Sequence, residues 1–104
     1  MEPLEAHQNP LGTVHGGIIT TLLDSAMGCA VHTTLPVGGM YTTLELKANF
    51  LRPSFAGGER LLCEGTVLNR GSTAVLVEAT VTGADSGKKI AHGVSTCLIL
   101  PPRG

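Results

Sequence analysis

The chain has 104 residues, 42% of them apolar and 14% charged, with a net charge of −1. This length predicts one domain over residues 1–104. The near-neutral charge, without a cluster of Lys and Arg, argues against nucleic acid as a partner. Because the charged fraction is well below the roughly 25% of an average soluble domain, we expect part of the surface to face another subunit.

Residues 1–8 are acidic and polar and contain neither a basic nor an apolar leader region. No apolar run approaches the ~20 residues that a membrane-spanning helix needs. The three cysteines are widely spaced and form no paired motif. Such thiols suit small buried side chains rather than disulfides or a zinc site. These features predict a cytoplasmic protein with no membrane partner and no metal.

A helix is predicted from residue 18 onward, because apolar residues recur there at three- and four-residue steps and form one broad face. It is preceded by His15-Gly16-Gly17, so the usual Ser, Thr, Asp or Asn cap is absent. The first helical amides therefore need another partner, and a ligand oxygen is one candidate. The two glycines allow close approach to the backbone, but a tight turn or close packing would explain them equally well.

Asp24 lies in the middle of this helix. A carboxylate beside leucines is costly unless it is paired, which suggests either a reactive acid or a side chain that faces solvent or bonds to Thr21 or Ser25. The rise of a helix separates Gly16 from Asp24 by roughly 12 Å. One substrate carbonyl cannot contact both within a single chain, so a shared substrate requires Asp24 from a second copy across a two-fold axis.

The remainder of the chain has the alternation of β-strands. In the segment 43–52, Leu44, Leu46, Ala48 and Phe50 share one face, opposite to the polar residues. Further strands are expected at 60–69, 73–82 and 89–100, and short turns between the last three predict antiparallel hairpins. One long helix followed by four antiparallel strands predicts an α+β domain in which the sheet covers the helix.

Three separated motifs carry a resemblance to a known family. Asn9, His15-Gly16-Gly17 and Asp24 resemble, in order and spacing, the signature of hotdog-fold acyl-CoA thioesterases of the phenylacetic-acid-degradation (PaaI-like) type. The segment 43–53 resembles the strand motif of that family, and Gly87-Lys88 followed by Ala91 resembles its final hairpin. The resemblance covers nearly the whole chain.

The resemblance implies the hotdog fold, in which an antiparallel sheet wraps one central helix. It places the strand at 43–50 beside the strand at 89–100 and near its two-fold mate. Relatives usually carry a helix and a strand before the Asn, and only eight residues precede Asn9 here. We therefore expect those two elements to be missing and a bare sheet edge to result.

The resemblance also implies a reaction, the hydrolysis of acyl-CoA thioesters to a free acid and CoA. The Gly16 amide, helped by Asn9, would polarise the thioester carbonyl. Asp24 of the other subunit would act as general base or as nucleophile. His15 would orient the site or the leaving thiolate, and Thr43 would position the water.

Contacts with the substrate are expected at Gly17, Thr42, Arg70 and Lys88. Thr42 is also the alternative to Thr43 as the residue that positions the water. Coenzyme A is part of the substrate, and no separate cofactor is implied. The family resemblance implies at least a homodimer and often a homotetramer. Two other functions stay open, a module that binds acyl-CoA without turnover and a hotdog enoyl-CoA hydratase or dehydratase.

Overall fold

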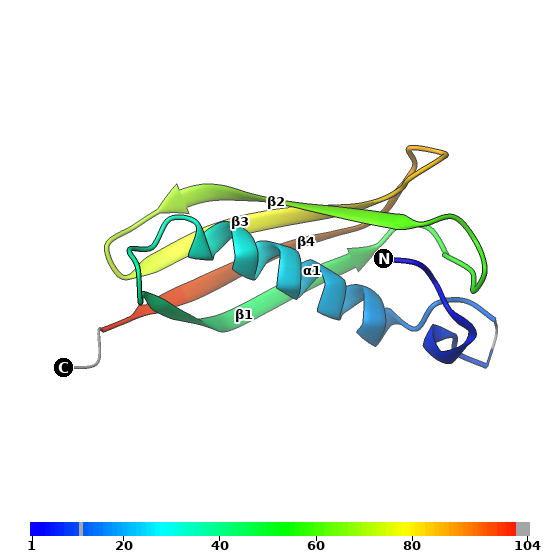
Figure 1. Ribbon diagram of the computed structural model, residues 1–104, viewed down its shortest axis with the longest axis horizontal. Coiled ribbons are helices and arrows are strands. Elements are labelled where there is room, and N and C mark those ends of the chain that lie inside the picture. The colour runs from blue at the N-terminus through cyan, green and yellow to red at the C-terminus, as the bar shows by residue number, and fades with distance from the viewer. Residues whose placement is uncertain (11, 102–104) are drawn as a thin grey trace.

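The computed structural model of the protein describes residues 1–10 and 12–101, and one long helix lies against one curved sheet (Figure 1). Before the long helix, the described residues form the short 3-10 helix η1 (Glu5–His7). The other elements are α1 (Gly16–His32), β1 (Met40–Phe50), β2 (Leu61–Arg70), β3 (Ala74–Gly83) and β4 (Lys89–Leu100). The predicted α+β architecture, with its helix and four strands, is confirmed.

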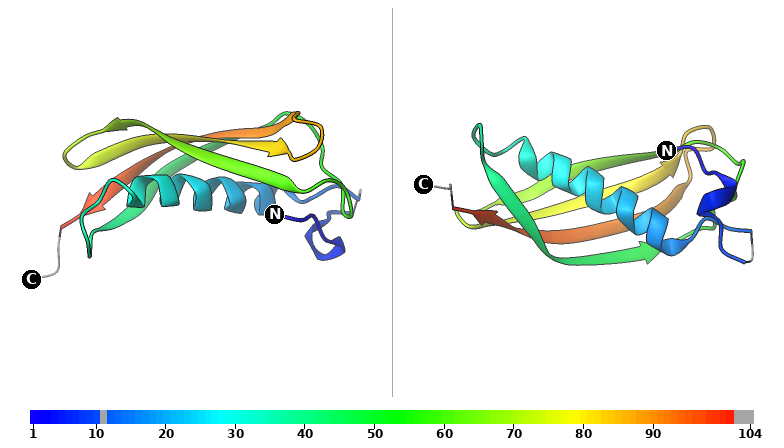
Figure 2. Two further views of the ribbon diagram at one scale, coloured as in Figure 1. Left: turned by 45° about the horizontal axis from the view of Figure 1, so that its top comes forward. Right: turned by 60° about the horizontal axis from the view of Figure 1, so that its bottom comes forward.

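All four strands are antiparallel to their neighbours, in the order β1-β4-β3-β2. The hairpins β2–β3 and β3–β4 follow the predicted turns, and β1 returns to pair with β4, as the family resemblance implied. The sheet curves around α1, which lies along its concave side (Figure 2). Among the described residues, β1 and β2 each have one neighbouring strand, so the outer edge of β1 is open in the single chain, whereas that of β2 is bonded to Met1 at Leu61.

The predicted alternation of β1 is wrong at one position. A β-bulge between Thr43 and Glu45 shifts the register against β4. A bulge adds one residue to a strand, so the side chains before it change faces. Leu44 is consequently 58% exposed on the outer face, whereas Leu46 packs against the core. Thr43 turns toward the helix instead.

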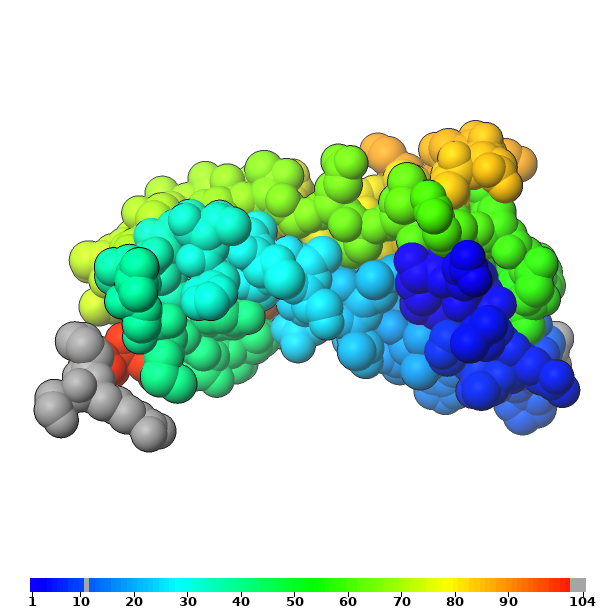
Figure 3. All heavy atoms as spheres, in the orientation of Figure 1, coloured from blue at the N-terminus to red at the C-terminus, as the bar shows by residue number. Residues whose placement is uncertain are grey.

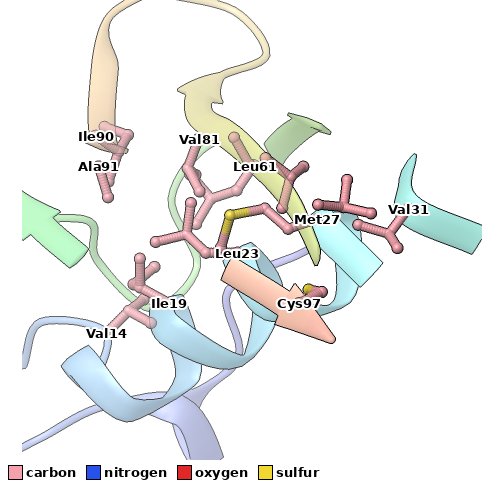
Figure 4. Packing of buried hydrophobic residues seen from close by; sticks show 13 residues of the cluster. Val14, Ile19, Leu23, Met27, Val31, Leu61, Val81, Ile90, Ala91 and Cys97 are labelled. Atoms are coloured by element: carbon pink, nitrogen blue, oxygen red, sulfur yellow. The ribbon is translucent and has the colours of Figure 1, made fainter. Parts of the chain in front are cut away.

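The helix buries one side chain per turn in the core. Ile19, Leu23, Met27 and Val31 point from α1 toward the sheet and are at most 3% exposed (Figure 4). Burial of a side chain of this size stabilises the fold by about 1.5–3 kcal/mol. These four residues fix the rotation of α1, and the rotation decides which residues of the helix face outward.

The opposite side of α1 stays uncovered in the single chain and forms part of the molecular surface between β1 and β2 (Figure 3). Gly17, Thr21, Asp24 and Ser25 are exposed on it. No helix in the described ranges combines the length and the apolar character needed to cross a bilayer.

Candidate active site

The start of α1 is capped, and the sequence-based expectation of an uncapped helix is wrong. His15 is the N-cap residue, and its Nδ1 accepts a hydrogen bond of 2.9 Å from the Gly17 amide. Histidine can serve this role because a neutral imidazole has one unprotonated ring nitrogen. The bond fixes the tautomer with the proton on Nε2, and it removes the Gly17 amide from the groups that could bind a ligand.

The Gly16 amide remains available. Within the described part of the chain, no acceptor lies on its N–H group, whereas the amides of Ile18 and Ile19 bond to the carbonyl of His15. Gly16 borders a cleft of about 350 Å3, whose lining also includes Ile19, Phe50 and Arg52. A side chain at residue 16 would meet Phe50, since a Cβ there would lie 3.3 Å from its Cζ. Glycine therefore allows β1 to approach the helix start closely.

Asn9 orders the loop before the helix. Its backbone N–H donates to the carbonyl of Thr13 over 2.7 Å, and its side-chain Oδ1 accepts from the Thr13 amide over 3.3 Å. His15 joins the same segment, because its backbone N–H donates to the carbonyl of His7 over 2.7 Å. The predicted Asn9 and His15 thus hold the backbone that leads to the Gly16 amide.

Asp24 lies on the exposed side of α1 rather than among the buried leucines. The hydroxyl of Thr43 donates to Asp24 Oδ1 over 3.2 Å. The alternative partner Thr21 is engaged elsewhere, since its hydroxyl donates to the carbonyl of Gly17. Because Thr42 points to the other face of β1, the structure brings Thr43, and not Thr42, to Asp24.

Asp24 and Thr43 border a pocket of about 360 Å3, whose other lining residues are Thr20, Thr21 and Leu46. This pocket and the cleft at Gly16 both lie along the seam between α1 and β1. The two elements run in opposite directions, so Gly16 sits beside Phe50 while Asp24 sits beside Thr43. One continuous helix joins the two sites and keeps them roughly 12 Å apart.

Tyr41 is a neighbour of this site that sequence reasoning missed. A Cβ on Gly28 would lie 2.1 Å from its phenol oxygen, so the phenol rests directly on the helix backbone, one turn beyond Asp24. Burial, followed by the charges of Cys97, Cys29 and Asp24, raises the pKa of Tyr41 above its ordinary value. Its position in the sequence could have indicated this, because Tyr41 is two residues before Thr43 and therefore on the same face of β1.

The basic residues predicted for substrate binding lie apart. Arg70 ends β2, at the sheet edge opposite to β1, and its Nη1 donates to the carbonyl of Gly71. Lys88 stands in the β3–β4 turn, where its amide donates to Ser86 Oγ. Arg52 was not among the predicted site residues, yet it borders the cleft at Gly16, and its Nη1 donates to the carbonyl of Lys89.

Among the described residues, no group of three or more His, Cys, Asp or Glu side chains is placed to hold a metal ion. The chemical groups described above are an amide at a helix start, a carboxylate with a hydroxyl donor, and a histidine. An amide at a helix start can stabilise a developing oxyanion, and a carboxylate can take a proton from water.

A sequence model of the thioesterase superfamily matches residues 11–90. Acyl-coenzyme A thioesterase 13 of Mus musculus is 31% identical over 96 residues, which are 92% of this chain and 67% of that protein. A curated protein of Halobacterium salinarum is 41% identical over 88 residues, or 82% of this chain and 56% of its own length.

Solved structures give the same picture. A Bacillus halodurans protein crystallised with CoA superposes with a TM-score of 0.86 and 35% identity, over 95% of this chain and 64% of that one. The E. coli PaaI protein of the phenylacetic acid degradation operon superposes with a TM-score of 0.89 at 22% identity, over 98% of this chain and 70% of that one. At this identity the similarity is one of fold. This chain thus spans little more than half to two thirds of the length of these relatives.

Proposed function

Because the chain belongs to the thioesterase superfamily, with the hotdog fold of its PaaI-like members, we propose that it hydrolyses acyl-CoA thioesters to a free acid and CoA. One observation carries the proposal. The Asp24 carboxylate, with the Thr43 hydroxyl bonded to it, borders a pocket on the same seam as the free Gly16 amide. The acid can take a proton from water and the amide can stabilise the oxyanion, which are the two roles in the proposed hydrolysis.

The distance between these groups within one chain leads us to a site shared by two copies. The edge of β1 is open and can pair with another strand. Antiparallel pairing of two β1 edges about a two-fold axis brings the end of one strand beside the start of the other. The Phe50 end, where Gly16 lies, would then approach the Thr43 end of the second copy, where its Asp24 lies.

In the proposed reaction, the thioester carbonyl oxygen accepts a hydrogen bond from the Gly16 amide of one copy. Asp24 of the second copy takes a proton from a water held by Thr43, and the water oxygen attacks the carbonyl carbon. The oxyanion stays bonded to the Gly16 amide until it collapses. The C–S bond then breaks and the CoA thiolate leaves, and the proton on Asp24 passes to the thiolate or to solvent. Direct attack by Asp24 is the other route open to a carboxylate.

The remaining predicted residues have supporting roles. Asn9 and His15 hold the backbone at the Gly16 amide, and the His15 ring is close enough to the helix start to orient the leaving thiolate. Lys88 is proposed to meet the CoA phosphates from the β3–β4 turn. Arg70 could do so only from another part of the assembly, because it lies on the sheet edge far from β1. We also propose a cytoplasmic location and a further pairing of dimers into a tetramer.

The test uses the pair Asp24→Asn and Asp24→Ala and measures thiol release from a panel of acyl-CoA esters. Asn keeps the shape and can still accept the Thr43 hydrogen bond, but it cannot take a proton. We expect both variants to lose about 10²–10⁴-fold in kcat. Because Cys29 is exposed and would react with a thiol reagent, all variants, and the wild-type reference, also carry Cys29→Ser. Full activity of Asp24→Asn would remove the carboxylate from the mechanism.

A mixed dimer tests whether the site is shared. Asp24→Ala and a variant without the Gly16 amide are each expected to be inactive alone. When subunits of the two variants exchange freely, half of the dimers hold one intact site, and activity should return to about a quarter of the wild-type value. No recovery, despite proven exchange, would place both groups in the same chain or remove one of them.

Two further outcomes would identify the other functions. Tight binding of acyl-CoA without thiol release would identify a binding module. Loss of enoyl-thioester absorbance without thiol release would identify a hydratase. Light scattering at native conditions decides the oligomeric state, and a monomer would contradict the shared site.

A further inference from the structure

We propose that Leu46 limits the length of the acyl group and that the site prefers short, unsubstituted acyl chains. This inference rests on the proposed function, because it assigns the pocket beside Asp24, called here the acyl pocket, to the acyl group of the substrate. The pocket has a polar end, formed by Asp24 and Thr43, where the thioester carbonyl would lie. The rest of its lining decides what the acyl chain meets.

The rest of the lining offers no free hydroxyl proton. The hydroxyl of Thr20 donates to the carbonyl of Gly16 over 2.8 Å, and the hydroxyl of Thr21 donates to that of Gly17 over 2.9 Å. Both hydroxyl protons are thus used within the helix. An oxygen substituent on the acyl chain would lose its water without gaining a hydrogen-bond donor, which costs affinity. An unsubstituted aliphatic chain has no such cost.

The residues that line the pocket lie from Asp24 toward the start of α1, and none lies toward its end. On that side the phenol oxygen of Tyr41 rests on the backbone at Gly28. In the other direction the pocket reaches one helical turn back, to Thr20, and is bordered by Leu46 on the β1 side. One turn is about 5.4 Å long, which corresponds to a short chain.

The β-bulge gives this assignment a matched control. Leu46 lies on the helix side of β1 and is partly buried, whereas Leu44, two residues earlier, is 58% exposed on the outer face. Substitution of either leucine removes the same atoms from the same strand. Only Leu46 borders the acyl pocket, so only its substitution should change the preference for acyl length.

The experiment compares kcat/KM for octanoyl-CoA and butanoyl-CoA in the wild type, Leu46→Ala and Leu44→Ala. Leu46→Ala removes three carbon atoms, and since one methylene in an apolar pocket changes kcat/KM by roughly 10-fold or more, the octanoyl-to-butanoyl ratio should rise at least that much. Leu44→Ala should leave the ratio as in the wild type. Because Leu46 also packs against the core, Leu46→Val serves as a milder variant and should shift the ratio in the same direction.

An unchanged ratio in a folded Leu46→Ala or Leu46→Val variant would overturn the inference, and so would an equal shift in Leu44→Ala. Leu46→Phe supplies the opposite test, since a larger side chain should lower the ratio. Failure of the proposed function is distinguishable, because the wild type would then release no thiol from either ester. A wild type that is active with both esters, and whose ratio does not depend on residue 46, contradicts only the role of Leu46.

Discussion

Replacement of Gly16 by proline should remove the proposed oxyanion donor with little change to the fold. Gly16 is the first helical residue, a position where proline is favoured because its missing N–H would not be bonded within the helix. A residue before proline must be extended, and His15 already has φ −61° and ψ 137°. The backbone is therefore prepared for proline at residue 16.

The matched control is Gly16→Ala, which adds a Cβ at the same place and keeps the N–H group. In both variants that Cβ lies 3.3 Å from Phe50 Cζ, and the ring of Phe50, which is 56% exposed, can move aside by a few tenths of an ångström. The two variants thus share the steric effect and differ in the donor. Loss of one oxyanion donor typically lowers kcat by about 10²–10³-fold, or roughly 2.7–4 kcal/mol.

The assay is thiol release from an acyl-CoA that the wild type hydrolyses, with urea denaturation to confirm that both variants are folded. We expect Gly16→Ala to retain most of the activity and Gly16→Pro to lose about 10²–10³-fold relative to it. Wild-type activity in both variants would refute the role of the amide. Equal losses would show that the added Cβ, and not the missing N–H, is responsible.

Three further predictions concern single side chains. Thr43→Val removes the donor to Asp24 and should lower kcat about 10-fold, with stability changed by less than about 0.5 kcal/mol, while Thr42→Val on the other face should leave the rate unchanged. Gly65→Ala would place a Cβ 2.5 Å from the carbonyl oxygen of Ala26, and this overpacking should destabilise the fold by about 1–3 kcal/mol in urea denaturation. Hydrogen bonds from the amide and hydroxyl of Ser86 lower the pKa of Glu59. The contribution of Glu59 to stability is therefore complete above its ordinary pKa and is lost as pH falls through the lowered value. In Glu59→Gln, the midpoint of urea denaturation should change less with pH in this acid range.

Much of the architecture could be predicted because it depends on local patterns. The helical period of the apolar residues from Ile18 onward and the alternation within each strand are properties of short segments, and the structure confirms the elements within three residues. The pairing of β1 with β4 came from the family resemblance, since a period cannot tell which strand lies beside which. The resemblance implied that Thr43, or else Thr42, positions the water, and in the structure Thr43 is the one whose hydroxyl donates to Asp24.

The sequence by itself determined the elements of this protein: one amphipathic helix, four antiparallel strands, and an acid eight residues after Gly16. Only the tertiary structure decided the β-bulge that turns Thr43 inward and Leu44 outward, the imidazole cap on Gly17, and the phenol of Tyr41 on Gly28. Each of these depends on a neighbour that is distant in sequence or on the exact backbone angle at one residue. A single added residue changes the face of the sheet to which a side chain points. Which of two registers a strand adopts is decided by the strands and the helix that pack against it.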